Sequence, residues 1–169
     1  VDKWAKAQMA INNGVDLVIE LPTIYAISSA ENFASGAIKI LNSLGIVDFL
    51  SFGSECNDIS VLDDIANVLA FEPSQYKTLL SHELSRGESF PKARENALMM
   101  YLNDIRRFAN VLSSPNNILG IEYLKALKKQ KSNITPITIK RQGSKYNDDT
   151  IPSNSRFASA TAIRIMCQS

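Results

Sequence analysis

Cysteine, histidine and tryptophan are scarce, since the chain of 169 residues has two cysteines, one histidine and one tryptophan. Cys56 and Cys167 are far apart and form no CxxC pair. The sequence therefore supports neither a disulfide framework nor a zinc site, and a reducing, cytoplasmic setting is expected. His82 alone would have to supply any His-based metal site or Ser-His-Asp triad, and its polar surroundings, SHELSRGES, indicate a surface residue. No metal ligands and no disulfide partner are predicted.

Long hydrophobic runs are missing as well. The longest are no longer than a strand, such as Val15–Leu21 with its two acidic residues, whereas a membrane-spanning helix needs about 20 apolar residues. No signal peptide is recognisable, so no contact with a membrane is expected. The patterns GxxxxGK(S/T) and GxGxxG are also absent, which excludes these two glycine-loop nucleotide sites.

The composition is that of an ordinary globular domain, with 45% hydrophobic and 21% charged residues and a net charge of +1. This near-neutrality argues against a strongly basic nucleic-acid-binding protein. The charge is uneven, however, because residues 1–119 carry nine basic and fourteen acidic side chains and residues 120–169 carry nine and three. The basic last third could contact a polyanion, although a solvated lysine-bearing helix face is the simpler interpretation of charge alone.

Hydrophobic spacing predicts an α/β protein. Strands are expected at 15–21, 47–52 and 134–141, and helices at about 4–11, 29–43, 118–129 and 159–166. The first two strands and the helix between them form a βαβ unit of a parallel sheet. Residues 58–112 have helical spacing throughout and are expected to form a helical insertion with a packing role. Because the chain opens within a helix and ends without a closing element, residues 1–169 are expected to be a single core that is incomplete at both ends.

Two polar segments lie where open α/β sheets hold their ligands, at a strand end or a helix start. In Phe52-Gly53-Ser54-Glu55, Gly53 follows a strand and allows the backbone to approach a flat ligand, although a plain turn glycine is the simpler alternative. In Ser113–Gly120, Asn116 and Asn117 stand at a helix start. They could bind a ribose hydroxyl or a base edge, or could cap the helix, and the residues leave both interpretations open.

A third segment, Phe157–Arg164, opens the last predicted helix. The hydroxyls of Ser159 and Thr161 and the free backbone N–H groups of a helix start can bind phosphate, and Arg164 can add a guanidinium contact. A capped amphipathic helix with an exposed arginine is the alternative. Because Arg141 ends the preceding strand, the phosphate interpretation is strengthened. Together the three segments predict a nucleotide pocket with its phosphates at the Ser/Thr/Arg end.

Five segments occur in a distinctive order: KWAKAQMAINNGVDLVIELP, ENFASGAIKILNSLGIVDFLSFGSE, SPNNILGIEYLKAL, TIKRQGSKYND and FASATAIR. In this order they resemble the tRNA(Met) cytidine acetate ligase family of the HxGH nucleotidylyltransferase superfamily. The resemblance extends from Val1 to Arg164, with VDLVIELP its most specific part and SATAIR a variant of the less specific superfamily motif (I/S)-(S/T)-x-T-x-x-R. It implies a Rossmann-like (HUP-type) parallel sheet flanked by helices, with the helical insertion at about 58–112.

The resemblance also implies a reaction. ATP and acetate would give acetyl-adenylate and pyrophosphate, and the acetyl group would pass to N4 of the wobble cytidine of elongator tRNA(Met). ATP would be a substrate, with Mg²⁺ bound through its phosphates. In-line attack of a carboxylate on the α-phosphate needs positioning and charge neutralisation rather than an enzyme nucleophile, which agrees with a sequence that has no convincing nucleophile–base pair.

Site residues follow from the same resemblance. ATP would contact Gly53, one of Asn116 and Asn117, and Arg141. The phosphate-binding helix start would comprise Ser159, Thr161 and Arg164. The tRNA would face the basic last third, above all Lys125, Lys128, Lys129 and Lys131. The HxGH motif of the family is expected upstream of Val1, so no catalytic residue is assigned, and these 169 residues are expected to be inactive alone.

Two other functions remain open at this point. A nucleotidylyltransferase acting on a small cofactor precursor would share the SATAIR-type helix but would not need the basic segment. A non-catalytic domain that binds a nucleotide or RNA would share the pocket without the chemistry.

Overall fold

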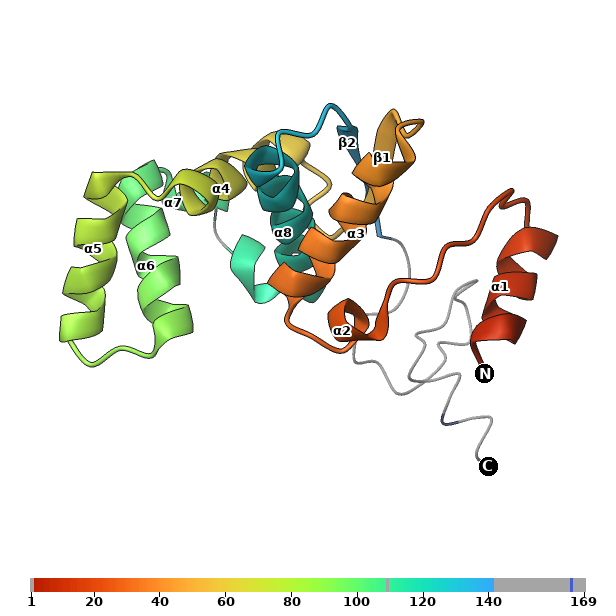
Figure 1. Ribbon diagram of the computed structural model, residues 1–169. Coiled ribbons are helices and arrows are strands. Elements are labelled where there is room, and N and C mark those ends of the chain that lie inside the picture. Colours follow the sequence, from red (N-terminus) through yellow and green to blue (C-terminus); the bar gives the residue numbers. More distant parts are fainter. Residues whose placement is uncertain (1, 109, 142–164, 166–169) are drawn as a thin grey trace.

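The computed structural model describes residues 2–108, 110–141 and 165 (Figure 1). Its elements are, in chain order, α1 (Lys3–Asn12), α2 (Thr23–Ala26), α3 (Ala30–Leu44), β1 (Phe49–Ser54), α4 (Ile59–Phe71), α5 (Ser74–Ser85), α6 (Phe90–Leu102), α7 (Ile105–Phe108), the 3-10 helix η1 (Val111–Ser113), α8 (Pro115–Lys129) and β2 (Thr135–Lys140). No helix in these ranges is both long and apolar enough to cross a membrane.

Local side chains set several helix ends. Ser29 caps α3 by accepting a hydrogen bond from the backbone N–H of Asn32, and Asp58 caps α4 by accepting from Ser60 and Val61. Gly45 ends α3 in the left-handed conformation, with φ 67°, which glycine adopts at little cost. These helix limits agree closely with those expected from the sequence, because a cap depends on residues within one turn.

The two strands β1 and β2 pair in parallel, with Phe49 opposite Thr135 and Ser54 opposite Lys140. Backbone hydrogen bonds from Thr135 to Asp48 and from Arg141 to Ser54 extend the pairing at both ends. The chain between the strands includes α4 and α8, and α8 also contacts β1. This parallel sheet with helical cover is the Rossmann-like α/β architecture that was expected.

The strand expected over residues 15–21 is absent from the structure. These residues follow α1 without sheet pairing, and Val15, Leu17, Val18 and Ile19 are 41–62% exposed. The predicted βαβ unit with residues 47–52 is therefore wrong. A strand needs a neighbour to pair with, and within the described residues β1 pairs with β2. The apolar character of residues 15–21 was therefore not sufficient to predict a paired strand.

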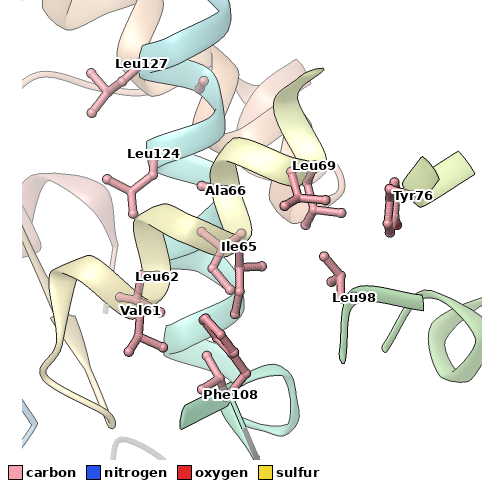
Figure 2. Packing of buried hydrophobic residues seen from close by; sticks show 14 of the residues in the cluster. Val61, Leu62, Ile65, Ala66, Leu69, Tyr76, Leu98, Phe108, Leu124 and Leu127 are labelled. Carbon is pink, nitrogen blue, oxygen red and sulfur yellow. The ribbon is translucent and has the colours of Figure 1, made fainter. Parts of the chain in front are cut away.

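The hydrophobic core is centred on α3, α4 and α8 and extends to Tyr76 of α5 and Leu98 of α6. It includes Ile38 from α3, Leu62 and Ile65 from α4, and Ile121 and Leu124 from α8, each at most 1% exposed. Figure 2 shows the side chains of α4 and α8 converging, with Tyr76 and Leu98 on the side of α5 and α6.

The segment predicted as a helical insertion, residues 58–112, has two parts. Helix α4 packs along α8 and belongs to the core, whereas α5 and α6 form an antiparallel hairpin that stands at one end of the molecule (Figure 1). Within the hairpin, Glu83 is fully buried and accepts hydrogen bonds from Asn96 and Arg86. The hydrogen bond from Asn96, together with Arg86, lowers the pKa of Glu83 below its ordinary value.

Candidate nucleotide site at the end of β1

Asn117 ties the end of β1 to the start of α8. Its side chain is 2% exposed, and its Oδ1 accepts hydrogen bonds from the backbone N–H groups of Glu55 (2.9 Å) and Cys56 (3.3 Å). Its Nδ2 donates to the carbonyl of Val111 at 3.1 Å. Because Oδ1 already accepts two hydrogen bonds, the Asn117 side chain stabilises the fold, and its amide oxygen is not available to accept from a ligand.

The side chain of Glu55 also binds the start of α8. Its Oε1 accepts a hydrogen bond from Nδ2 of Asn116 at 2.7 Å, and its Oε2 accepts from the backbone N–H of Asn117 at 3.1 Å. The first N–H groups of a helix have no partner within the helix, and Ser114 at the N-cap makes no side-chain cap bond. Glu55 therefore caps α8 from another element, where the helix dipole also favours a negative charge.

A pocket of about 280 Å³ lies beside these residues, lined by Leu50, Ser51, Phe52, Gly53, Asn116, Leu119, Gly120 and Tyr123. Phe52 and Tyr123 pack with their ring centroids 5.8 Å apart. A Cβ atom at Gly120 would lie 2.6 Å from Cε2 of Phe52, so the glycine permits the close approach of α8 to β1. Burial raises the pKa of Tyr123 above its ordinary value.

Gly53 and Arg141 complete this edge of the sheet. A Cβ atom at Gly53 would meet little, the nearest atom being the carbonyl oxygen of Ile139 at 4.0 Å, so the backbone here is open to a ligand. Arg141 follows β2, and its backbone N–H donates to the carbonyl of Ser54 at 3.0 Å. The structure thus places Gly53 and Asn116 in one pocket and Arg141 at the same carboxyl edge.

Ser159, Thr161 and Arg164 lie outside the described residues, so the predicted phosphate-binding helix start has no structural account.

A larger hollow of about 660 Å³ lies at the end of α6, lined by Asn96, Met99, Met100, Asn103, Asp104 and Arg106. We favour the smaller pocket, because open α/β sheets hold ligands at the carboxyl ends of their strands.

The four lysines predicted to face tRNA differ in their surroundings. Lys125 is 7% exposed, and its Nζ lies 2.6 Å from Oε2 of Glu122 and 3.0 Å from Oε1 of Glu31. These carboxylates hold the charge of Lys125 inside the protein, which does not favour the predicted contact of Lys125 with tRNA. Lys128 is partly exposed and pairs with Asp63 at 2.9 Å, while Lys129 and Lys131 are exposed.

The ion pairs of Lys125 form part of a network across three helices. Glu122 of α8 is 4% exposed and its Oε1 lies 3.7 Å from Nη2 of Arg94 in α6. The hydrogen bond from Lys125 lowers the pKa of Glu31 in α3.

Sequence reasoning missed Glu55, Glu122 and Tyr123. The i, i+3 spacing of Glu122 and Lys125 was a visible signal for an ion pair on one helix face.

Comparison with known proteins agrees with this fold. A sequence model of the HIGH Nucleotidyl Transferase family matches residues 1–169. The tRNA(Met) cytidine acetate ligases of Clostridium novyi (strain NT) and Caldanaerobacter subterraneus subsp. tengcongensis are 52% and 53% identical over 164 residues, which is 97% of this chain. The chain spans about 40% of the length of these curated relatives.

Two solved structures are similar over nearly all of the chain. The crystal structure of Thermotoga maritima TmcAL in its apo form I has a TM-score of 0.93 and 41% identity, covering 99% of this chain and 40% of that chain. The crystal structure of the same protein bound with alpha-thio ATP (form II) has a TM-score of 0.88 and 41% identity, covering 99% and 39%. The resemblance recognised in the sequence is thereby confirmed, and the chain belongs to the HIGH nucleotidyl transferase family.

Proposed function

We propose that this chain supplies the nucleotide-binding part of an ATP-dependent ligase that acetylates the wobble cytidine of elongator tRNA(Met). The observation that carries the proposal is the pocket between β1 and the start of α8, lined by Gly53 and Asn116, with Arg141 following the neighbouring strand β2. Support for the substrates comes from relatives about 52% identical that are named tRNA(Met) cytidine acetate ligase, and from a similar structure bound with alpha-thio ATP.

In this proposal the adenosine occupies the pocket. The open backbone at Gly53 allows a flat ring or ribose to lie against β1, and Asn116 provides the polar contact. Asn116 takes this role rather than Asn117, because the amide oxygen of Asn117 already accepts two backbone hydrogen bonds. Arg141 lies on the side of the phosphates, and Ser159, Thr161 and Arg164 remain predicted phosphate ligands.

The proposed reaction has two steps. An acetate oxygen attacks the α-phosphorus of ATP, the bond to the bridging oxygen of the β-phosphate breaks, and pyrophosphate leaves. The N4 amine of cytidine then attacks the acetyl carbonyl, and AMP leaves with the electrons of the mixed anhydride bond while the amine loses a proton. Positive groups such as Arg141 would stabilise charge on the phosphate oxygens. Mg²⁺ would be held mainly through the phosphates.

Acetate dependence tests the reaction on the full-length protein. ATP–pyrophosphate exchange is expected to require acetate, and nucleoside mass spectrometry should then find N4-acetylcytidine in a tRNA(Met) transcript. Exchange that is indifferent to acetate would favour a nucleotidylyltransferase for a small cofactor precursor. If ATP binds but neither exchange nor acetylation is detected, a non-catalytic domain that binds a nucleotide or RNA is favoured.

Asn116→Ala tests the pocket. The variant is expected to raise the KM for ATP about tenfold, the effect of one lost hydrogen bond of ordinary strength. Because it also removes the hydrogen bond from Asn116 to Glu55, thermal unfolding of the variant is measured alongside the KM. The matched control is Asn133→Ala, because Asn133 is exposed and lies beyond the opposite, amino end of β2. Equal KM values for the two variants would contradict the placement of adenosine.

The proposed tRNA surface includes Lys129 and Lys131, which are exposed at the end of α8 and just beyond it. Charge reversal of both to Glu should weaken tRNA binding and flatten its salt dependence, because fewer counterions are released from the phosphate backbone. Filter binding across a salt series measures both quantities. Reversal of Lys6 and Lys39, which are exposed and change the charge equally, is the control, and identical salt slopes in the two double variants would contradict the surface.

A further inference from the structure

Glu55 and the start of α8 hold each other through reciprocal hydrogen bonds. The side chain of Asn117 accepts from the backbone N–H of Glu55, and the backbone N–H of Asn117 donates to Oε2 of Glu55. The other carboxylate oxygen, Oε1, accepts from Nδ2 of Asn116 at 2.7 Å. Both oxygens of Glu55 are therefore fixed, and the position of the carboxylate is set by the backbone of two elements.

This fixed carboxylate determines how the Asn116 side chain is turned. A carboxylate offers acceptors and no donor, so it can bind the NH₂ end of a carboxamide but not its oxygen end. With Nδ2 directed to Glu55, the opposite end of the amide is Oδ1. Asn116 is half-buried and lines the pocket beside Gly53, so its oxygen is the end available to a bound molecule.

We propose that Glu55 is a positioning residue that holds the amide oxygen of Asn116 toward the nucleotide, so that the pocket selects a nucleoside presenting a hydrogen-bond donor. The inference rests on the proposed function, in which adenosine occupies this pocket. Two groups of adenosine can be that donor, a ribose hydroxyl and the exocyclic N6 amine. Hypoxanthine has an oxygen in place of N6, and two acceptors facing each other would leave both unpaired, which is the strongest basis of such discrimination.

The decisive variant is Glu55→Gln. Its amide oxygen can still accept from the backbone N–H of Asn117, so the cap on α8 is kept, but its NH₂ group now faces Asn116. Asn116 then turns its own oxygen toward Gln and presents Nδ2 to the pocket. Binding of ATP to the full-length protein should weaken about tenfold, as for one lost hydrogen bond, and the KM should rise while kcat stays close to that of the unchanged protein.

Analogues identify the donor. If N6 is read, the preference for ATP over inosine triphosphate should fall about tenfold or more in Glu55→Gln, while the ratios for 2′-deoxy-ATP and 3′-deoxy-ATP stay unchanged. If a ribose hydroxyl is read, the ratio for the matching deoxy analogue collapses instead. The exposed Glu88→Gln, with the same change of charge, should leave every ratio as it is.

A second substitution should restore the original polarity. In the double variant Glu55→Gln with Asn116→Asp, one Asp oxygen accepts from the Gln NH₂ group and the other faces the pocket. ATP affinity and the analogue ratios should return to within about threefold of the original values, a difference well below that of one hydrogen bond. A residue that only maintained the fold would not be rescued in this way.

The outcomes separate the two proposals. If the unchanged protein fails to bind ATP, the proposed function is wrong. If it binds ATP but Glu55→Gln keeps all analogue ratios, or the double variant is no better than the single one, the positioning role of Glu55 is wrong while the adenosine pocket stands. Thermal unfolding of each variant shows whether a loss of binding comes from a loss of fold.

Discussion

The N-terminal part of the chain and helix α8 differ in a way that their compositions do not suggest. Residues 2–33 include Trp4, Leu17 and Ile19, yet none of these residues is buried and Trp4 is 75% exposed. Helix α8 carries Asn117, Glu122 and Lys125, and all three are at most 7% exposed. Burial in this protein therefore depends on which elements pack against each other. Polar side chains are buried where a hydrogen-bond or ion-pair partner is available.

The partners explain the difference. Helix α8 contacts α3, α4, β1 and η1, and its buried polar groups are paired, Asn117 with the loop after β1 and Lys125 with Glu122 and Glu31. In the N-terminal part an exposed ion pair, Lys3 with Glu20 at 2.9 Å, joins α1 to the extended residues that follow. Substitutions of the same type in the two regions should therefore have very different effects.

Removal of a lysine should show the largest difference. Lys125→Ala leaves Glu122 buried without its closest cation, and breaking a buried ion pair from one side destabilises proteins by about 3–5 kcal/mol. Lys3→Ala removes an exposed pair, for which about 0–1 kcal/mol is expected. Urea unfolding followed by circular dichroism measures both, and a loss at Lys125 no larger than that at Lys3 would show that the network does not stabilise the core.

Truncation of a leucine should come next. Leu124→Ala, at a residue that is 1% exposed, should lower the free energy of unfolding by about 3 kcal/mol through lost burial and a cavity. Leu17→Ala, at a residue that is 62% exposed, should change it by less than about 0.5 kcal/mol. Comparable losses would mean that residues 15–21 are covered in solution, which would remove the contrast between the two regions.

The α5–α6 hairpin offers the smallest and most selective test. It adds Tyr76 and Leu98 to the hydrophobic core and has a buried charge of its own. The pKa of Glu83 is lower in the folded state than its ordinary value of 4.5. Its stabilising effect is therefore complete above that ordinary value and is lost as the pH falls through the lowered folded-state pKa. Glu83→Gln should flatten the acid side of the stability curve below the ordinary glutamate pKa. The exposed Glu88→Gln should not, and equal curves for both variants would argue against a buried charge.

What could be predicted from the sequence was mostly local. The helical segments expected from residues 29 and 58 onward begin there as α3 and α4, because their caps, Ser29 and Asp58, act within one turn. The strand over 15–21 was predicted from its apolar run and is absent, because pairing depends on a neighbour that the run itself does not specify. The motif residues Gly53 and Asn116 did meet in one pocket.

Contacts between distant residues were beyond the sequence. Asn116 and Asn117 could not be distinguished, because the group that separates their roles is Glu55, 61 and 62 residues away. Lys125 and Lys129 are one helical turn apart, and both lie near Glu31 of α3, at 3.0 and 3.8 Å. Lys125 is nevertheless buried, with Glu122 2.6 Å away, whereas Lys129 is exposed. Charge patterning predicted a positive net charge for residues 120–169, but not which of the lysines there are exposed.

The parallel pairing of β1 and β2 affects the order in which the molecule forms. Oγ of Ser54 and Oγ1 of Thr138 lie 2.6 Å apart although they are separated by 84 positions in the chain. Such long-range pairing is slow compared with the formation of local helices. During synthesis, α3, α4 and the α5–α6 hairpin can form before β2 leaves the ribosome. Until then, the edge of β1 that pairs with β2 has no partner strand. Arg141 follows β2, so the carboxyl edge of the sheet is expected to be the last part of this region to assemble.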